Sequence, residues 1–390
     1  MSHDQPTPGL DLDATLADPG IRIVVCCGAG GVGKTTTAAA LALRAAERHG
    51  RRTVVLTIDP ARRLAQSMGL TELDNTPRPV SGVDTASGGG LDAMMLDMKR
   101  TFDDVVLTHT SREQAEEIFA NPFYQAMSST FAGTQEYMAM EKLSQLSEID
   151  EDRGGWELIV VDTPPSRSAL DFLDAPKRLA TFLDSRMLRI LLAPARVGGA
   201  SMLRMFGASL NLFGRAMHRI LGAQLLTDLS TFVASLDSMF GGFADRAART
   251  YQVLQAKQTA FLVVATPEPD AIREAGYFAG RLAEDRMPLA GLVLNRVHAA
   301  APGLSAERCL AAAEALAQTG AGKQAGNAAV TAEVLLLHAE LVRQVRRERR
   351  IADRFRRAHP GVPVAEVPAL PEDVHDLDGL RAIGAALVPG

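Results

Sequence analysis

The chain has 390 residues, of which 22% are charged and 47% hydrophobic. This balance is typical of a soluble protein that buries a core, and it excludes collagen-like, coiled-coil and disordered chains. The 41 basic and 46 acidic residues leave a net charge of −5, so no overall positive field indicates a nucleic-acid-binding protein.

Residues 1–20 are acidic, contain proline and lack an apolar stretch, so we expect a flexible tail rather than a secretory signal. The most apolar region, Met187 to Phe243, is interrupted by arginines too often for the roughly 20-residue apolar span that a bilayer requires. Three cysteines, two of them adjacent, are too few for a disulfide framework or a four-ligand zinc site. The sequence therefore predicts a cytoplasmic protein that is not an integral membrane protein.

Short apolar runs predict β-strands separated by helical stretches. The first run carries no charge after Arg22, which is typical of a strand buried on both faces of a parallel sheet. An Ala/Leu-rich helix over Thr35–His49, with Gly50 as its C-cap, follows it. Strands alternating with helices predict βαβ units, and so an α/β fold with a mainly parallel, doubly wound sheet. The predicted strands are Ile21–Cys27, Arg52–Asp59, Asp92–Met98, Trp156–Asp162, Ala260–Thr266, Pro288–Asn295 and Val362–Val367.

Two regions, 100–150 and 184–257, show helical periodicity without strands. We interpret them as a helical subdomain inserted into one α/β domain that covers residues 21–390. Residues 319–331 are small and polar, which predicts a flexible loop. An arginine-rich helix over Leu341–Arg357 follows this loop.

A glycine-rich segment lies between the first predicted strand and the first predicted helix. It reads Gly28-Ala29-Gly30-Gly31-Val32-Gly33-Lys34-Thr35 and matches the P-loop pattern G-x4-G-K-[ST], whose backbone N–H groups and following helix N-terminus bind phosphates. Lys34 is then expected to contact the β- and γ-phosphates, and the Thr35 hydroxyl to be a Mg²⁺ ligand. A glycine-rich turn without a ligand is the alternative, which the flanking strand and helix disfavour. The phosphate-binding residues predicted in this way are Gly30, Gly31, Val32, Gly33, Lys34, Thr35 and Thr36.

Two aspartates end predicted strands at the edge of the sheet where the P-loop lies. Asp162 closes the run WELIVVD, so it is expected to reach the Mg²⁺ shell through water. Asp59 ends the second strand, where it could orient the water that attacks the γ-phosphate. A structural role as a helix N-cap remains an alternative for each, and Pro60 suits the first position of a helix capped by Asp59.

Together these segments resemble the ArsA family of anion-transporting ATPases, which is related to the targeting factor for tail-anchored membrane proteins. The P-loop, Asp59-Pro60-Ala61 and Asp162-Thr163-Pro164-Pro165 stand in the order of that family's P-loop, first switch and second switch. The likeness extends through residues 132–136 and Asn295-Arg296 to Val367–Pro371, and it covers nearly everything after residue 20.

The resemblance implies a P-loop NTPase fold, with ATP as the substrate, and a dimer that switches between two conformations. It implies that Asp59 positions the attacking water, so that Asp59 and Lys34 are the catalytic residues, and that Asn295 contacts adenine. The guanine-reading pattern N-K-x-D is absent where Asn295-Arg296-Val297-His298 stands, so we expect ATP rather than GTP.

One departure from the family lies in the P-loop itself. The family normally has a second lysine immediately before the Gly-Gly pair, which reaches the partner's nucleotide across the dimer, and here this position is Ala29. We therefore expect pairing with a homologous chain that carries the lysine, or with a second copy of this chain. Arg62, Arg63 and Arg167 are candidate substitutes for the lysine, and each is otherwise explained as a surface charge. The family's C-x-x-C pair for an intersubunit zinc is also absent. Arsenite binding is not expected, because Cys26, Cys27 and Cys309 do not occupy the family's metalloid-ligand positions.

Two further surfaces have a functional and a structural interpretation. The Met-rich helical region 187–243 fits a groove for an apolar client helix, or a stripe that packs in the core. The arginines of 343–357 fit contact with anionic lipid, which would make the protein peripheral at a membrane, or a solvated helix face.

Three functions follow from the sequence. The first is an ATPase whose hydrolysis drives a dimeric switch that binds or releases a client or partner. The second is a catalytically weak, nucleotide-binding regulatory subunit of a heterodimer, which Ala29 motivates. The third is a P-loop small-molecule kinase, although no acceptor-site motif is visible.

Overall fold

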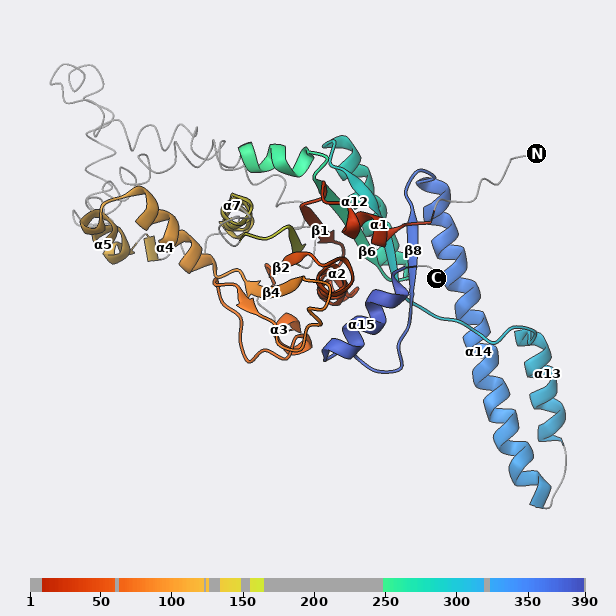
Figure 1. Ribbon diagram of the computed structural model, residues 1–390. Coiled ribbons are helices and arrows are strands. Elements are labelled where there is room, and N and C mark those ends of the chain that lie inside the picture. The colour runs from red at the N-terminus through yellow and green to blue at the C-terminus, as the bar shows by residue number, and fades with distance from the viewer. Residues whose placement is uncertain are drawn as a thin grey trace, which may run out of the picture.

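The computed structural model describes residues 9–59, 63–122, 124–125, 134–148, 155–164, 248–318 and 323–388. At its centre is an eight-stranded sheet in the order β3-β4-β2-β5-β1-β6-β7-β8 (Figure 1). All neighbouring pairs are parallel except β3 and β4, which confirms the mainly parallel α/β fold. The strands are β1 (Ile23–Cys27), β2 (Arg52–Thr57), β3 (Arg78–Pro79), β4 (Gly90–Met95), β5 (Leu158–Asp162), β6 (Thr259–Ala265), β7 (Leu289–Val297) and β8 (Val364–Pro368).

The inner strands are buried on both faces, as the uncharged first run predicts. Every residue of β1, β5 and β6 is buried, because helices cover the two faces of the sheet. Helix α2 (Lys34–His49) packs on β2 and β5, and Gly50 ends it in the left-handed conformation predicted for a C-cap. Helix α12 (Pro269–Glu284) packs on β6 and β7.

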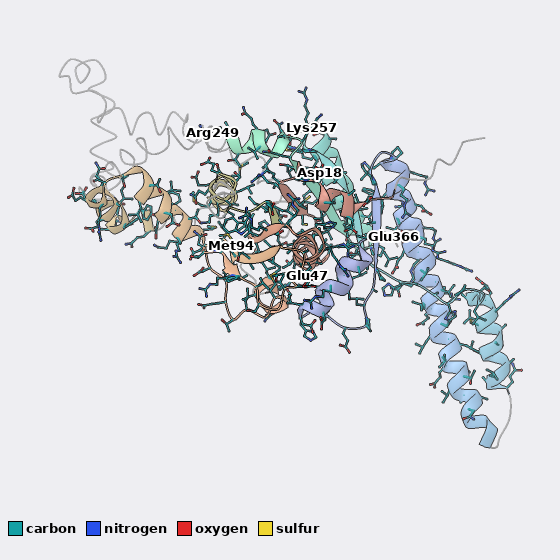
Figure 2. All side chains as sticks on the ribbon, viewed as in Figure 1. Asp18, Glu47, Met94, Arg249, Lys257 and Glu366 are labelled. Atoms are coloured by element: carbon teal, nitrogen blue, oxygen red, sulfur yellow. The ribbon has the colours of Figure 1, made fainter. Side chains whose placement is uncertain are left out.

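A C-terminal helix, α15 (Leu377–Ala386), packs against α2. Arg381 of α15 forms an ion pair with Glu47 of α2 over 2.8 Å, and Figure 2 labels Glu47 in this part of the molecule. The last residues of the described chain are thereby held against the helix that begins at the P-loop.

Residues 9–20, the described part of the predicted flexible tail, are ordered against the domain. Helix α1 (Leu12–Ala17) begins after Asp11, whose side chain accepts the N–H of Ala14, and it buries Leu12 and Leu16. Asp13 pairs with Arg44 of α2 over 2.6 Å, and this guanidinium lowers the pKa of Asp13 to about 2. The spacing of two leucines by one helical turn gives the segment an apolar face, which lets it dock on the domain.

The helical insertion is described only in part. Helices α4 (Met98–His109), α5 (Arg112–Ala120) and α7 (Thr134–Ser147) lie in the first predicted region, and residues 248–255 are helical at the end of the second. Most of the second region, with the whole of 187–243, lies outside the described residues. The subdomain boundaries and the client surface therefore stay predictions.

The predicted loop over 319–331 is wrong from residue 323 onward. Helix α14 (Lys323–Ala358) begins there, and the predicted Leu341–Arg357 helix is its C-terminal half. Residues 327–331 are exposed or only partly buried, and the helix is held further along its length, where Ala339 and Val342 of α14 pack with Ala306 and Cys309 of α13 (Ala306–Ala317). Figure 1 shows α13 and the first half of α14 projecting from the body as a hairpin.

Candidate nucleotide-binding site

The P-loop has the backbone geometry of an anion site. Gly33 precedes α2 with φ +96° and offers no side-chain cap, so the first N–H groups of the helix are left for a ligand. A Cβ at Gly33 would lie 2.2 Å from the Asn295 amide nitrogen, and one at Gly28 would lie 2.1 Å from the Val264 carbonyl oxygen. Only glycine fits these two positions, so the loop is held in the phosphate-cradling form between β1 and α2.

Lys34 lies across this loop. Its Nζ donates a hydrogen bond to the Ala29 carbonyl oxygen over 2.7 Å, and its side chain is buried. Burial lowers the pKa of Lys34, while Asp162 and Asp59 act in the opposite direction. A buried ammonium held by one neutral carbonyl group can be drawn strongly to phosphate oxygens.

Asp162 is tied directly to the P-loop helix. One carboxylate oxygen, Oδ2, accepts hydrogen bonds from the Thr35 hydroxyl at 2.7 Å and from the Thr57 hydroxyl at 2.9 Å. The other oxygen, Oδ1, is buried and has no hydrogen-bond partner in the described structure. Burial raises the pKa of Asp162 to about 6 against the opposing effect of the two hydroxyls.

These groups fit a Mg²⁺ ion. The ion requires oxygen ligands and keeps several waters, so a hydroxyl and one orphaned carboxylate oxygen are sufficient protein donors beside a polyphosphate. Thr35 and Asp162, the two predicted metal residues, are therefore brought together.

Asp59 borders the same space. Its backbone N–H donates to the Thr57 hydroxyl oxygen at 3.2 Å, which links it to the group that holds Asp162. It lines a cleft of about 690 Å³ together with Lys34, Thr35 and Arg63. The cleft thus brings together Asp59 and Lys34, the two predicted catalytic residues.

The alternative N-cap role of Asp59 involves residues 60–62, which lie outside the described residues. Helix α3 (Arg63–Ser67) begins after them.

Asn295 lies in the cleft wall but makes a contact that the sequence did not predict. Its amide nitrogen donates to the Val32 carbonyl oxygen over 2.9 Å, so the side chain braces the P-loop. The predicted strand ends at Asn295, whereas β7 continues to Val297. Its contact with adenine stays a prediction.

One wall of the cleft comes from the C-terminal segment 368–375, which the sequence did not identify as part of the site. Leu370, Glu372 and His375 are among its lining residues, as is His298 at the end of β7. The only sequence signal was the family likeness of Val367–Pro371. The segment reaches the site because β8 lies beside β7, and both strands end at the same edge of the sheet.

The adjacent cysteines lie in the core of the sheet. Cys26 and Cys27 are buried in β1, and burial raises the pKa of the Cys27 thiol to about 12. Neither thiol is therefore a thiolate ligand at neutral pH.

Comparison with known proteins decides which kind of P-loop protein this is. Residues 21–318 match the family described as anion-transporting ATPase. The chain belongs to this family. Family membership confirms the resemblance and places the chain among ATP-hydrolysing enzymes, with ATP as the substrate.

Curated relatives of this anion-transporting ATPase carry related names. It is 26% identical over 278 residues to "ATPase GET3C" of Arabidopsis thaliana, an alignment that covers 69% of this chain and 65% of that protein. It is 26% identical over 316 residues to "ATPase get3" of Neurospora crassa, covering 79% of this chain and 81% of that protein. An arsenical pump-driving ATPase of Halobacterium salinarum is 31% identical over 185 residues, covering 45% of this chain and 27% of that protein.

No helix within the described part of the chain is long and apolar enough to cross a membrane.

Of the three arginines named as candidate substitutes for the missing lysine, the structure describes one. Arg63 lines the cleft, whereas Arg62 and Arg167 lie outside the described residues.

Proposed function

We propose that this chain hydrolyses MgATP to ADP and phosphate in the cleft between the P-loop and segment 368–375, and that the reaction switches a dimer between two conformations. The observation that carries the proposal is the buried Asp162 carboxylate, which is held by the Thr35 hydroxyl and keeps one oxygen unpartnered among the described residues. A simple glycine-rich turn gives no reason to bury such a group at this position.

Each residue has a distinct role in the proposed reaction. Lys34 leaves the Ala29 carbonyl oxygen and binds the β- and γ-phosphates, where it offsets their negative charge. Thr35 would hold Mg²⁺ directly and Asp162 would hold it through water, and the ion when bound would supply charge neutralisation at the phosphate oxygens.

Asp59 acts on the nucleophile. It accepts a hydrogen bond from a water molecule and orients its oxygen toward the γ-phosphorus. The new P–O bond forms as the bond to the β–γ bridging oxygen breaks; ADP leaves, and the proton of the water passes to Asp59 or to the phosphate product. The position of Asp59 beside Lys34 and Thr35 in one cleft supports this role.

The output of the reaction is proposed to be a change in how the chain binds its partner. Ala29 has no charge to offer across a dimer, so the proposed partner is a homologous chain that carries a lysine at this position. The apolar region 187–243 is the proposed client surface. A second candidate function, a regulatory subunit that binds ATP with little turnover, is favoured by the same Ala29.

The test measures phosphate release from ATP by the purified full chain, with Mg²⁺ and with EDTA. We expect Mg²⁺-dependent release that disappears in Lys34→Ala, together with ATP binding. Lys257→Ala is the matched control, because Lys257 is exposed and is labelled in Figure 2. It lies just before β6, whereas the P-loop follows the other end of the parallel strands.

The other outcomes separate the alternatives. Tight ATP binding without phosphate release supports the regulatory subunit, and release of ADP only with an added acceptor supports a kinase. Unchanged tight ATP binding by folded Lys34→Ala contradicts the assignment of the site.

A further inference from the structure

The end of β7 contains an irregularity beside the P-loop. Leu294 pairs with Glu366 of β8 and Val297 pairs with Pro368, so two residues of β7 lie opposite one of β8. This is a β-bulge, a feature that redirects side chains next to functional sites. The two bulged residues are Asn295 and Arg296.

Arg296 has a backbone conformation that is rare for a residue with a side chain. Its φ is +59°, and the only other described non-glycine residue with positive φ is Arg286, at +56°. Glycine would adopt this conformation without strain, so an arginine here carries a backbone cost that glycine would avoid.

Asn295 locks Arg296 to the P-loop. The Asn295 amide nitrogen donates to the Val32 carbonyl oxygen at 2.9 Å, while its Oδ1 accepts the backbone N–H of Arg296 at 3.0 Å. One side chain therefore fixes the distance between the strained residue and the phosphate loop.

Arg296 borders two spaces. Arg296 lines the 690 Å³ cleft with Gly31 and Lys34, and it also lines a pocket of about 300 Å³ with Ala29 and Glu268. It is exposed, and within the described ranges it makes no ion pair, although acidic side chains line the smaller pocket. Arg296 thus brings a positive charge next to the phosphate loop.

The charges around the cleft indicate what this cation binds. Three cationic and three acidic side chains line the cleft in the described structure: Lys34, Arg63 and Arg296, against Asp59, Glu372 and Asp373. The lining therefore has no net excess of positive charge. The binding of a polyphosphate then depends on the positions of the individual cationic side chains. Arg63 follows β2, and Arg296 lies near the end of β7. These two strands are on opposite sides of β1 in the sheet.

We propose that Arg296 is a phosphate-binding residue of the nucleotide site, contacting the polyphosphate from the side of β7, opposite Arg63. This inference rests on the proposed function, because it requires a nucleotide in the cleft. Arginine suits the role, since its planar donors hold phosphate oxygens in pairs and stay charged. The bulge and the Asn295 contacts fix the backbone of Arg296 beside the P-loop, within reach of a polyphosphate in the cleft.

The experiment compares the affinities of the full chain for MgATP, MgADP and AMP in the wild type, Arg296→Ala, Arg296→Gly and Arg296→Lys. We expect Arg296→Ala and Arg296→Gly to weaken MgATP and MgADP binding at least about 10-fold and AMP binding less, because AMP has fewer phosphates. Arg296→Lys should recover part of the loss.

Arg286→Gly is the matched control. It removes an exposed arginine with the same left-handed backbone, at the far edge of the sheet before β7. Both glycine variants should raise the melting temperature through relief of strain, but only Arg296→Gly should lose nucleotide affinity.

Two results overturn the inference, and they are distinguishable. If wild-type chain binds MgATP and folded Arg296→Ala and Arg296→Gly bind it equally well, Arg296 is no phosphate ligand and only this inference fails. If the folded wild type binds no MgATP, the proposed function fails with it.

Discussion

The Thr35 hydroxyl donates a hydrogen bond to Asp162 Oδ2 over 2.7 Å, which joins the first turn of α2 to the end of β5. Asp162 pairs by register with Cys26 of β1 and Thr57 of β2. The carboxylate thus sits where three neighbouring strands end, and its single unpartnered oxygen within the described residues is buried there. This arrangement predicts an unusual dependence of stability on pH.

Asp162→Asn should stabilise the nucleotide-free protein at pH 8 and have less effect at pH 5. The folded-state pKa of Asp162 is raised to about 6, above its ordinary value of 3.8. A raised pKa stabilises the fold while the group is protonated, and that contribution is lost as pH rises through about 6, at a cost on the order of 3 kcal/mol. The amide remains neutral and can still accept both hydroxyl hydrogen bonds.

Melting temperatures between pH 4.5 and pH 8.5 check this prediction. MgATP should stabilise the wild type most at high pH, because the ionised carboxylate is the form that holds the metal shell, and Asp162→Asn should lose this gain. Identical pH profiles for the two proteins would show that Asp162 does not titrate in this range.

Asp59→Asn should keep ATP affinity within a few-fold, while turnover falls by roughly two orders of magnitude or more. The amide retains the size and the backbone contact to Thr57 but cannot accept the proton of the attacking water. Single-turnover phosphate release and equilibrium ATP binding give the two quantities. Asp353→Asn, an exposed change on α14, is the control. Equal losses of binding and turnover would make Asp59 a structural residue.

Ala29→Lys should accelerate phosphate release by a homodimer of this chain. Ala29 borders the 300 Å³ pocket with Gly30 and three acidic side chains of the α12 region, so the loop surface has room and charge for a lysine. Cationic groups supplied across an interface are worth about 10³–10⁵ in rate in other P-loop enzymes, which sets the upper bound.

The measurement compares the wild-type chain, Ala29→Lys, and the wild type mixed with a homologous chain that has the lysine. Faster release in the last two supports pairing with such a chain. A wild type as fast as the mixture, with no effect of Ala29→Lys, would show that a cation of this chain already performs the task.

Leu12→Ala should destabilise the protein by about 2–4 kcal/mol, because the side chain is fully buried and its removal leaves a cavity. Leu304→Ala is the control, since Leu304 is 48% exposed and its truncation should change stability little. Urea denaturation of both variants measures the difference. If Leu12→Ala were as stable as the wild type, the result would support the flexible tail that the sequence predicts for residues 1–20.

The P-loop and the inner strands could be predicted from the sequence because their causes are local. Gly33 has φ +96°, a conformation that favours glycine, and uncharged runs such as β1 are what a doubly covered strand requires. The meeting of Thr35 and Asp162 also followed from the sequence, since parallel strands end at one edge.

Features that depend on distant packing were not predictable. The wall formed by 368–375 depends on the place of β8 in the sheet, and the length of α14 beyond the predicted helix coincides with its pairing with α13. The left-handed Arg296 has no local signal, because its backbone is set by the bulge between β7 and β8.

Helix α14 runs without interruption from the body of the protein to the tip of the hairpin. At its body end, the Glu348 carboxylate contacts His298, a cleft residue, over 2.8 Å. At its other end, Val330, Val334 and Leu337 are exposed. With a rise of about 1.5 Å per residue, a tilt of α14 by about 10° at Glu348 would displace Val330 by about 5 Å. A pair of distance labels, one at the hairpin tip and one on the body, would therefore report even a small tilt of this helix.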